Sequence, residues 1–150
     1  MKHAVNYSKT LGVDLQAAWS VLRDFGSIIH WVTEGDAGSI STSGSGIGMT
    51  RDLTLPSVGD VQHRLDALDE TNHLITYSLS KGQPIGMKDY CVSISLDRSS
   101  DSCDIKWEGV FDAVAGADAE DVALRLKAAF ETMTLLFERY VNRTALKQGF

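Results

Sequence analysis

Three side chains that could bind a ligand or transfer a proton alternate with apolar residues in separate strand-like segments: Arg51, His63 and Tyr90. Each shares the parity of the apolar side chains in its own segment, and side chains of one parity lie on one face of a strand. We therefore expect all three to point into the interior. A buried arginine needs a partner. Arg51 could hold a ligand carboxylate or enolate, or it could pair with a chain carboxylate or backbone carbonyls, directly or through water.

The other candidate residues are aromatic or titratable. His63 could act as an acid or a base near neutral pH, although a lone inward histidine is more often a hydrogen-bonded wall residue. The hydroxyls of Tyr77 and Tyr90 could meet a polar group of a ligand. The catalytic candidates are therefore His63, Tyr90 and Arg51. The candidate ligand-binding residues add aromatic and soft apolar side chains that could equally be plain core: Arg51, His63, Tyr77, Tyr90, Trp107, Phe130, Met133 and Phe137.

The sequence lacks the residue patterns that metal sites, phosphate loops and nucleophilic catalysis require. The four histidines have no metal-ligand spacing, and Cys91 and Cys103 form neither a disulfide framework nor a metal motif. The glycine-rich run 44–48 lacks the lysine and the following helix of a phosphate loop. No Ser-His-Asp, Cys-His or Gly-x-Ser-x-Gly arrangement occurs. We therefore expect neither a metal nor a cofactor.

Length and charge narrow the class of protein. The chain has 150 residues, which suits one domain over residues 1–150. Its net charge is −6 and its basic residues do not cluster, so nucleic acid is not an expected partner. No apolar run is long enough to span a membrane, and the first residues lack the apolar core of a signal peptide. We expect a cytoplasmic protein. The oligomeric state stays open, a homodimer included.

The elements that must position these residues follow from periodicity. Seven segments read as strands, and the short turns between them indicate an antiparallel meander: residues 4–10, 36–41, 47–55, 61–66, 75–79, 90–96 and 103–111. Two short helices, 15–22 and 27–31, follow the first strand, and Asp14 is a good N-cap for the first of them.

The last element is a long helix over residues 117–148, with Asp118 as its expected N-cap. Its apolar stripe runs along one face: Val122, Leu126, Phe130, Met133, Phe137, Tyr140 and Val141, widened by Leu124, Ala128 and Leu135. No neighbouring helix is long enough to cover that stripe, so we expect the sheet to cover it. A long helix set against one curved sheet usually leaves a cavity between the two.

This order of elements resembles the helix-grip fold of the START/Bet v 1-like (SRPBCC) superfamily. Within it the chain resembles the bacterial polyketide cyclase/dehydrase-like family, which is also similar to the plant abscisic acid receptors. The resemblance covers nearly the whole chain and rests on an ordered set of short motifs: residues 19–26, 30–31, 46–51, 64–69, 76–79, 87–90 and 106–111. It implies an α+β fold in which a curved seven-stranded antiparallel sheet wraps around the C-terminal helix, with an interior cavity.

Three functions remain open because this superfamily hosts carriers, receptors, cyclases and lyases. The first is binding of a small hydrophobic or aromatic molecule, lipid or polyketide-like, in the cavity. The second is a cyclase or dehydratase in which His63 or Tyr90 transfers protons and Arg51 stabilises an enolate. The third is a regulatory module whose loops near Pro56 and Pro84 contact a partner when the cavity fills. We also expect Gly109 to border the cavity, so that a bulky replacement there would block it.

Overall fold

In the computed structural model, which describes residues 1–32, 38–56 and 58–148, seven strands form one antiparallel sheet in the order β1-β7-β6-β5-β4-β3-β2. The strands are β1 (His3–Leu11), β2 (Ser39–Ser43), β3 (Thr50–Leu55), β4 (Gly59–Asp69), β5 (Leu74–Lys81), β6 (Met87–Ser99) and β7 (Ser102–Ala113). From β2 to β7 each strand pairs with the next one along the chain, and β1 pairs with β7 at the far edge. The predicted meander is confirmed.

Two short helices follow β1: α1 (Leu15–Leu22) and the 3-10 helix η1 (Phe25–His30). Asp14 caps α1 by accepting hydrogen bonds from the backbone N–H groups of Gln16 and Ala17. Glu70, at the turn between β4 and β5, accepts hydrogen bonds from Trp19 Nε1 at 2.8 Å and from the Arg23 guanidinium. This carboxylate therefore ties α1 to the sheet.

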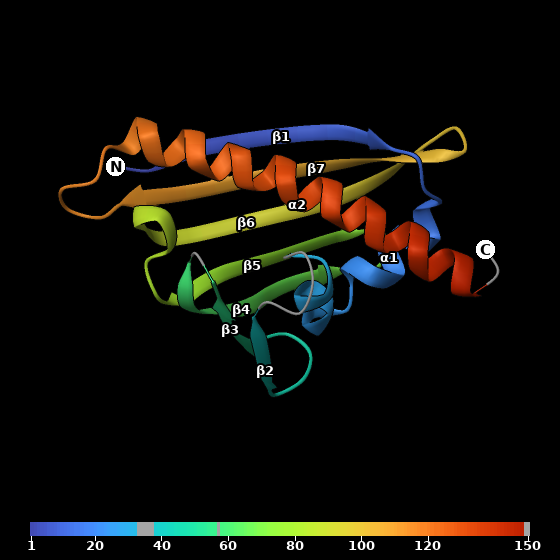
Figure 1. Cartoon of the computed structure of the whole chain (residues 1–150), viewed down its shortest axis with the longest axis horizontal. Helices are drawn as coiled ribbons and strands as arrows, with labels where there is room; N and C mark the ends of the chain where they lie inside the picture. Colours follow the sequence, from blue (N-terminus) through green and yellow to red (C-terminus); the bar gives the residue numbers. More distant parts are fainter. Residues whose placement is uncertain (33–37, 57, 149–150) are drawn as a thin grey trace.

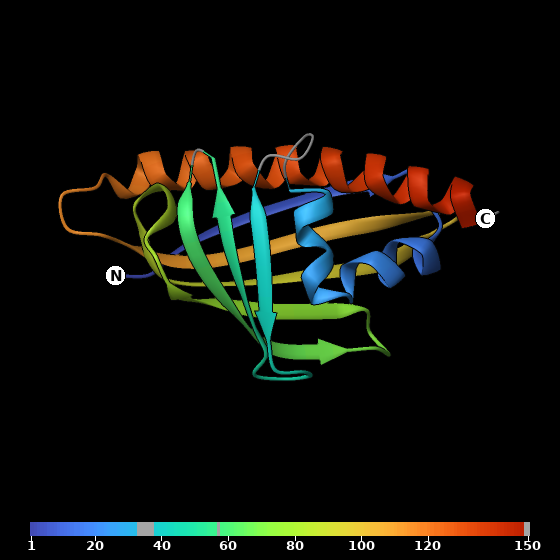
Figure 2. The same cartoon turned by 60° about the horizontal axis from the view of Figure 1, so that its bottom comes forward.

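The long helix α2 (Ala119–Gln148) crosses the concave face of the sheet (Figures 1 and 2). Its 30 residues span about 45 Å at 1.5 Å per residue. Asp118 accepts a hydrogen bond from the N–H of Glu120, as expected of an N-cap. The face toward the sheet carries the predicted stripe, of which Val122, Leu126, Phe130, Phe137 and Val141 are buried and Met133 and Tyr140 half-buried. The helix-grip arrangement is confirmed.

The exposure of three apolar residues and the end of one strand differ from the sequence prediction. Leu124 is 70% exposed and Leu135 also faces solvent, so the stripe on α2 is narrower than predicted. Ile47 is 61% exposed because the glycines on either side, Gly46 and Gly48, have positive φ and place it in a turn before β3. Strand β6 runs to Ser99, through part of the predicted turn. The predicted start of the second strand, residues 36 and 37, lies outside the described residues.

The sheet and α2 approach each other closely at Gly109 on β7. A Cβ atom added there would lie 2.9 Å from Phe130 Cζ and 3.3 Å from Tyr90 Cε1. Phe130 is fully buried and stacks on Trp107, with 4.8 Å between the ring centroids, so it has little room to move. Gly109 is therefore a packing position beneath Phe130, and the expectation that it borders the cavity is wrong.

We expect Gly109→Ala to lower the free energy of unfolding by about 1–3 kcal/mol, because the added methyl group overpacks the contact with Phe130. Urea denaturation followed by tryptophan fluorescence measures this change. Gly26→Ala is the matched control: its added Cβ would meet nothing closer than 3.6 Å, and its φ is not positive. Equal stability of the two variants would mean that the close approach at Gly109 carries no constraint.

Candidate functional site

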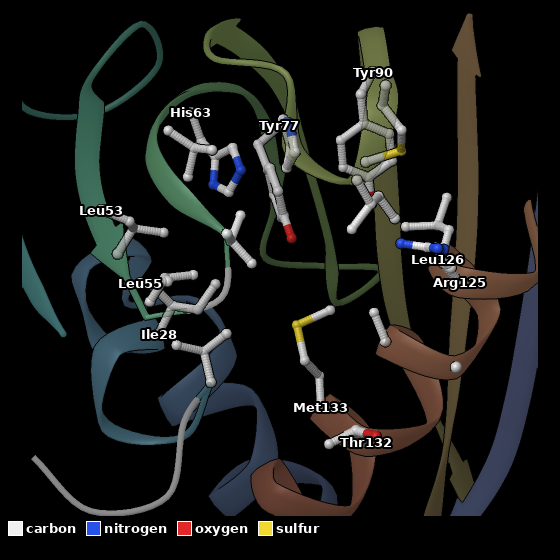
Figure 3. Close-up of a pocket in the computed structure, with 18 of the residues that line it drawn as sticks. Ile28, Leu53, Leu55, His63, Tyr77, Tyr90, Arg125, Leu126, Thr132 and Met133 are labelled. Carbon is white, nitrogen blue, oxygen red and sulfur yellow. The ribbon is translucent and has the colours of Figure 1, made fainter. Parts of the chain in front are cut away.

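A cavity of about 500 Å³ lies between α2 and the β3–β6 part of the sheet (Figure 3). Its walls come from η1, four strands, the short 3-10 helix η2 (Pro84–Gly86) and α2. The lining consists of Ile28, Val32, Leu53, Leu55, Pro56, Val58, Val61, His63, Tyr77, Pro84, Ile85, Met87, Tyr90, Arg125, Leu126, Ala128, Ala129, Thr132 and Met133. Most of these side chains are apolar, and none of the described residues that line the cavity is an aspartate or a glutamate.

The structure divides the eight predicted ligand-binding residues into two groups. His63, Tyr77, Tyr90 and Met133 line the cavity. Arg51, Trp107, Phe130 and Phe137 do not belong to its lining. The three aromatic residues of the second group are fully buried in the core, where Trp107 stacks on Phe130 and Phe137 meets Trp31 edge to face.

Arg51 lies behind the cavity wall, held by η1 and β4. Its Nη1 donates a 2.7 Å hydrogen bond to the carbonyl oxygen of Phe25, and its Nε donates a 3.1 Å hydrogen bond to Nδ1 of His63. The guanidinium carbon lies 3.9 Å from the ring centroid of Phe25 and 4.5 Å from that of Tyr77. Arg51 and His63 are directly opposite each other in the β3–β4 register, so the backbone itself places the two side chains together.

The charge of Arg51 is buried without a countercharge among the described residues. The side chain is 3% exposed, and it forms no ion pair with a carboxylate of the described residues. Burial lowers the pKa of Arg51 from 12.5 to about 10, which still leaves the guanidinium charged at neutral pH. Its Nη2 atom is buried and has no hydrogen-bond partner among the described residues. Of the two pairings weighed from the sequence, Arg51 makes the one with a backbone carbonyl.

His63 is a neutral imidazole in this environment. Burial, and then the positive charge of Arg51, lower the pKa of His63 well below 6.5. Because Nδ1 accepts the hydrogen bond from Arg51, the ring hydrogen of the neutral form must be on Nε2. The ring lies beside that of Tyr77, with 4.8 Å between centroids, and forms part of the cavity wall (Figure 3). His63 therefore offers the cavity a hydrogen-bond donor.

Tyr77 and Tyr90 supply the other polar groups of this wall. Burial raises the pKa of both hydroxyls, and that of Tyr90 lies well above 10, so both stay protonated at neutral pH. The hydroxyl of Tyr77 points into the cavity (Figure 3). These groups can bind a polar atom of a ligand by hydrogen bonds. Among the described residues, no group of three His, Cys, Asp or Glu side chains could hold a metal ion.

Most of the apolar side chains that line the cavity are not among the ligand-binding residues predicted from the sequence. Leu53, Leu55 and Val61 share the parity of Arg51 and His63, so the strand pattern that marks the polar residues also marks them. Ala129 and Thr132 lie on the flank of the predicted α2 stripe, where a small side chain gives no hydrophobic signal. Ile28 and Ile85 come from short 3-10 helices, whose orientation no periodicity predicts.

Comparison with solved structures assigns the fold. An uncharacterised protein from Bacillus thuringiensis matches with a TM-score of 0.77 at 18% identity, covering 93% of this chain and 98% of that one. The protein XoxI from Bacillus cereus matches with a TM-score of 0.79 at 16% identity, covering 92% and 94%. Norcoclaurine synthase from Thalictrum flavum, solved with dopamine and hydroxybenzaldehyde, matches with a TM-score of 0.75 at 15% identity, covering 95% and 88%. The chain has the Bet v 1-like helix-grip fold.

The family follows from the sequence profile. The profile described as polyketide cyclase / dehydrase and lipid transport matches residues 2–141, and the chain belongs to this family. No curated protein sequence matches the chain significantly. No helix among the described residues combines the length and apolar character needed to cross a membrane. Family and fold together support a domain that binds a hydrophobic ligand.

The lowered pKa of His63 predicts a loss of stability in acid. In the unfolded chain the histidine has a pKa near 6.5 and binds a proton below that pH, whereas in the folded chain it stays neutral. The contribution of neutral His63 to the free energy of unfolding is therefore complete above about pH 6.5 and falls as the pH drops below it. His63→Asn keeps an acceptor for Arg51 but cannot titrate. We therefore expect the difference in unfolding free energy between unchanged protein and variant to shrink below pH 6.5, by at most about 1.4 kcal/mol per pH unit. Urea denaturation at several pH values measures it, and a constant difference would contradict a low pKa for His63.

Proposed function

We propose that this protein binds a small, mainly apolar molecule, lipid or polyketide-like, in the cavity beneath α2. The observation that carries the proposal is the composition of the cavity wall. About 500 Å³ of space is lined by aliphatic and aromatic side chains, and three buried polar side chains, His63, Tyr77 and Tyr90, are placed among them. This volume and this mixture of residues are typical of sites for small molecules.

The comparisons support a ligand of this kind. The family description includes lipid transport alongside cyclase and dehydrase activity. A protein of the same fold, norcoclaurine synthase, was solved with dopamine and hydroxybenzaldehyde, both small aromatic molecules. A small aromatic or lipid-like ligand also suits a cavity of this volume and composition.

The alternative is a cyclase or dehydratase that transfers protons in the same cavity, and the chemistry of the wall favours it less. A histidine whose pKa is held well below 6.5 is a weak base at neutral pH, and the nitrogen that faces Arg51 already accepts a hydrogen bond. Tyr90 has a raised pKa, which weakens it as an acid. Arg51 does not belong to the cavity lining, so it does not contact an enolate bound there directly. We therefore place binding ahead of turnover.

Filling the cavity from α2 should abolish ligand binding. Ala129 is a small, half-buried residue of the wall, and Ala129→Trp would add an indole to the space. With the neutral dye N-phenyl-1-naphthylamine as the probe, we expect saturable binding at about one site in the unchanged protein. We expect a loss of about tenfold or more in the variant, because the ligand and the indole compete for one volume. Fluorescence titration measures both.

Leu124→Trp is the matched control because Leu124 lies on the same helix but is 70% exposed and outside the lining. This variant should bind the dye as the unchanged protein does. Melting curves of both variants separate a filled cavity from a damaged fold. If the Ala129→Trp protein folds and binds the dye as strongly as the unchanged protein, the proposal that this cavity is the ligand site is contradicted.

A further inference from the structure

The polar wall of the cavity presents a donor that has no acceptor within the described chain. His63 is 8% exposed, its Nδ1 atom takes the hydrogen bond from Arg51, and its Nε2 atom has no hydrogen-bond partner among the described residues. In Figure 3 the imidazole ring lies beside Tyr77 among the residues that line the cavity. Nε2 is not one of the fully enclosed polar atoms without a partner, and the imidazole lines the cavity. A ligand that fills the cavity would remove water from this N–H, which is costly unless the ligand supplies an acceptor. A ligand with an acceptor oxygen would satisfy it.

The surroundings of this donor favour negative charge. Arg51 lies directly behind His63. Among the described residues, its buried charge has no carboxylate partner and one of its guanidinium nitrogens has no hydrogen-bond partner. The described residues that line the cavity include one arginine, Arg125, and no carboxylate. Asp121 pairs with Arg125 at 3.0 Å, whereas Arg51 forms no ion pair with any carboxylate of the described residues. The protein as a whole carries a net charge of −6, so the buried positive charge of Arg51 behind this wall is opposite in sign to the overall charge.

We propose that Arg51 is a positioning residue that fixes the hydrogen of His63 on Nε2, and that the cavity thereby selects ligands ending in an acidic oxygen, a carboxylate or an enolate. The inference rests on the proposed function and adds the chemical class of the ligand to it. Arg51 acts through His63: its hydrogen bond fixes the orientation of the ring, and its charge strengthens the donor that the ring presents.

Three ligands with one apolar skeleton test the selection: 2-naphthoate, its neutral methyl ester, and the cationic 2-naphthylmethylamine. Calorimetry at about pH 7 should show 2-naphthoate binding about tenfold or more tighter than the ester, because a hydrogen bond to a charged acceptor is stronger than one to a neutral acceptor. The amine should bind more weakly than the ester. If none of the three binds, the proposed function fails. If all three bind equally, that function stands and the selection is overturned.

Two conservative variants test whether His63 is the donor. His63→Asn places its amide near the position of Nδ1, so it retains an acceptor for Arg51 but loses the donor at Nε2. His63→Gln reaches one methylene further and can place an N–H near the position of Nε2. The preference for 2-naphthoate over the ester should fall to near parity in His63→Asn and persist in His63→Gln. A full preference in the folded His63→Asn protein would overturn the proposal.

Nitrogen NMR of histidine-labelled protein tests the positioning role directly, since the ¹⁵N shift separates a protonated ring nitrogen from a bare one. In the unchanged protein Nε2 should carry the hydrogen and Nδ1 should be bare between about pH 6 and 8. In Arg51→Met a share of the ring hydrogen should move to Nδ1, and the preference for 2-naphthoate should drop. A hydrogen on Nδ1 in the unchanged protein, or an unaltered ring and preference in Arg51→Met, would overturn the role of Arg51. If Arg51→Met does not fold, the unchanged protein and His63→Asn decide the question.

Discussion

The buried charge of Arg51 is the constraint on which the arrangement of the site depends. Removing a guanidinium from water costs several kcal/mol, and no carboxylate of the described chain compensates for it. The protein instead surrounds it with the faces of Phe25 and Tyr77, the carbonyl of Phe25 and the bare nitrogen of His63. Cation–π contacts of a desolvated arginine contribute about 2 kcal/mol each. One side chain thus joins β3, β4, β5 and η1, and these elements form one side of the cavity.

The cavity itself comes from uneven contact between α2 and the sheet. Near β1 and β7 the helix is held tightly: Phe130 sits on Gly109 and Trp107, and Glu138 accepts a 2.7 Å hydrogen bond from the N–H of Gly12. On the other side, β2, β3 and β4 reach toward the helix, as Figure 2 shows, and the cavity lies between α2 and strands β3 to β6. The helix presents small side chains to that space, Ala128, Ala129 and Thr132, which leave it unfilled.

The sequence predicts which face of each strand is buried, because strand periodicity is local. It therefore predicts the burial of Arg51, His63 and Tyr90, and the structure confirms it. It does not separate the cavity wall from the packed core, because that depends on the curvature of the sheet and on how close α2 comes to each strand. Trp107 has the inward parity of β7 and Phe137 belongs to the buried stripe of α2, yet neither lines the cavity, because both lie where the helix packs closely. Nor can a pattern of side chains reveal that the partner of Arg51 is a backbone carbonyl.

The order of elements along the chain also determines when this cavity can exist. Strands β2 to β7 pair with their sequence neighbours, so that part of the sheet can assemble hairpin by hairpin with short loop closures. β1 must wait for β7 to be synthesised, and α2 follows all seven strands. The apolar concave face is therefore open to solvent until the residues around Met133 leave the ribosome. During synthesis the nascent sheet therefore exposes an apolar, aggregation-prone face, and a closed cavity forms only when α2 packs over that face.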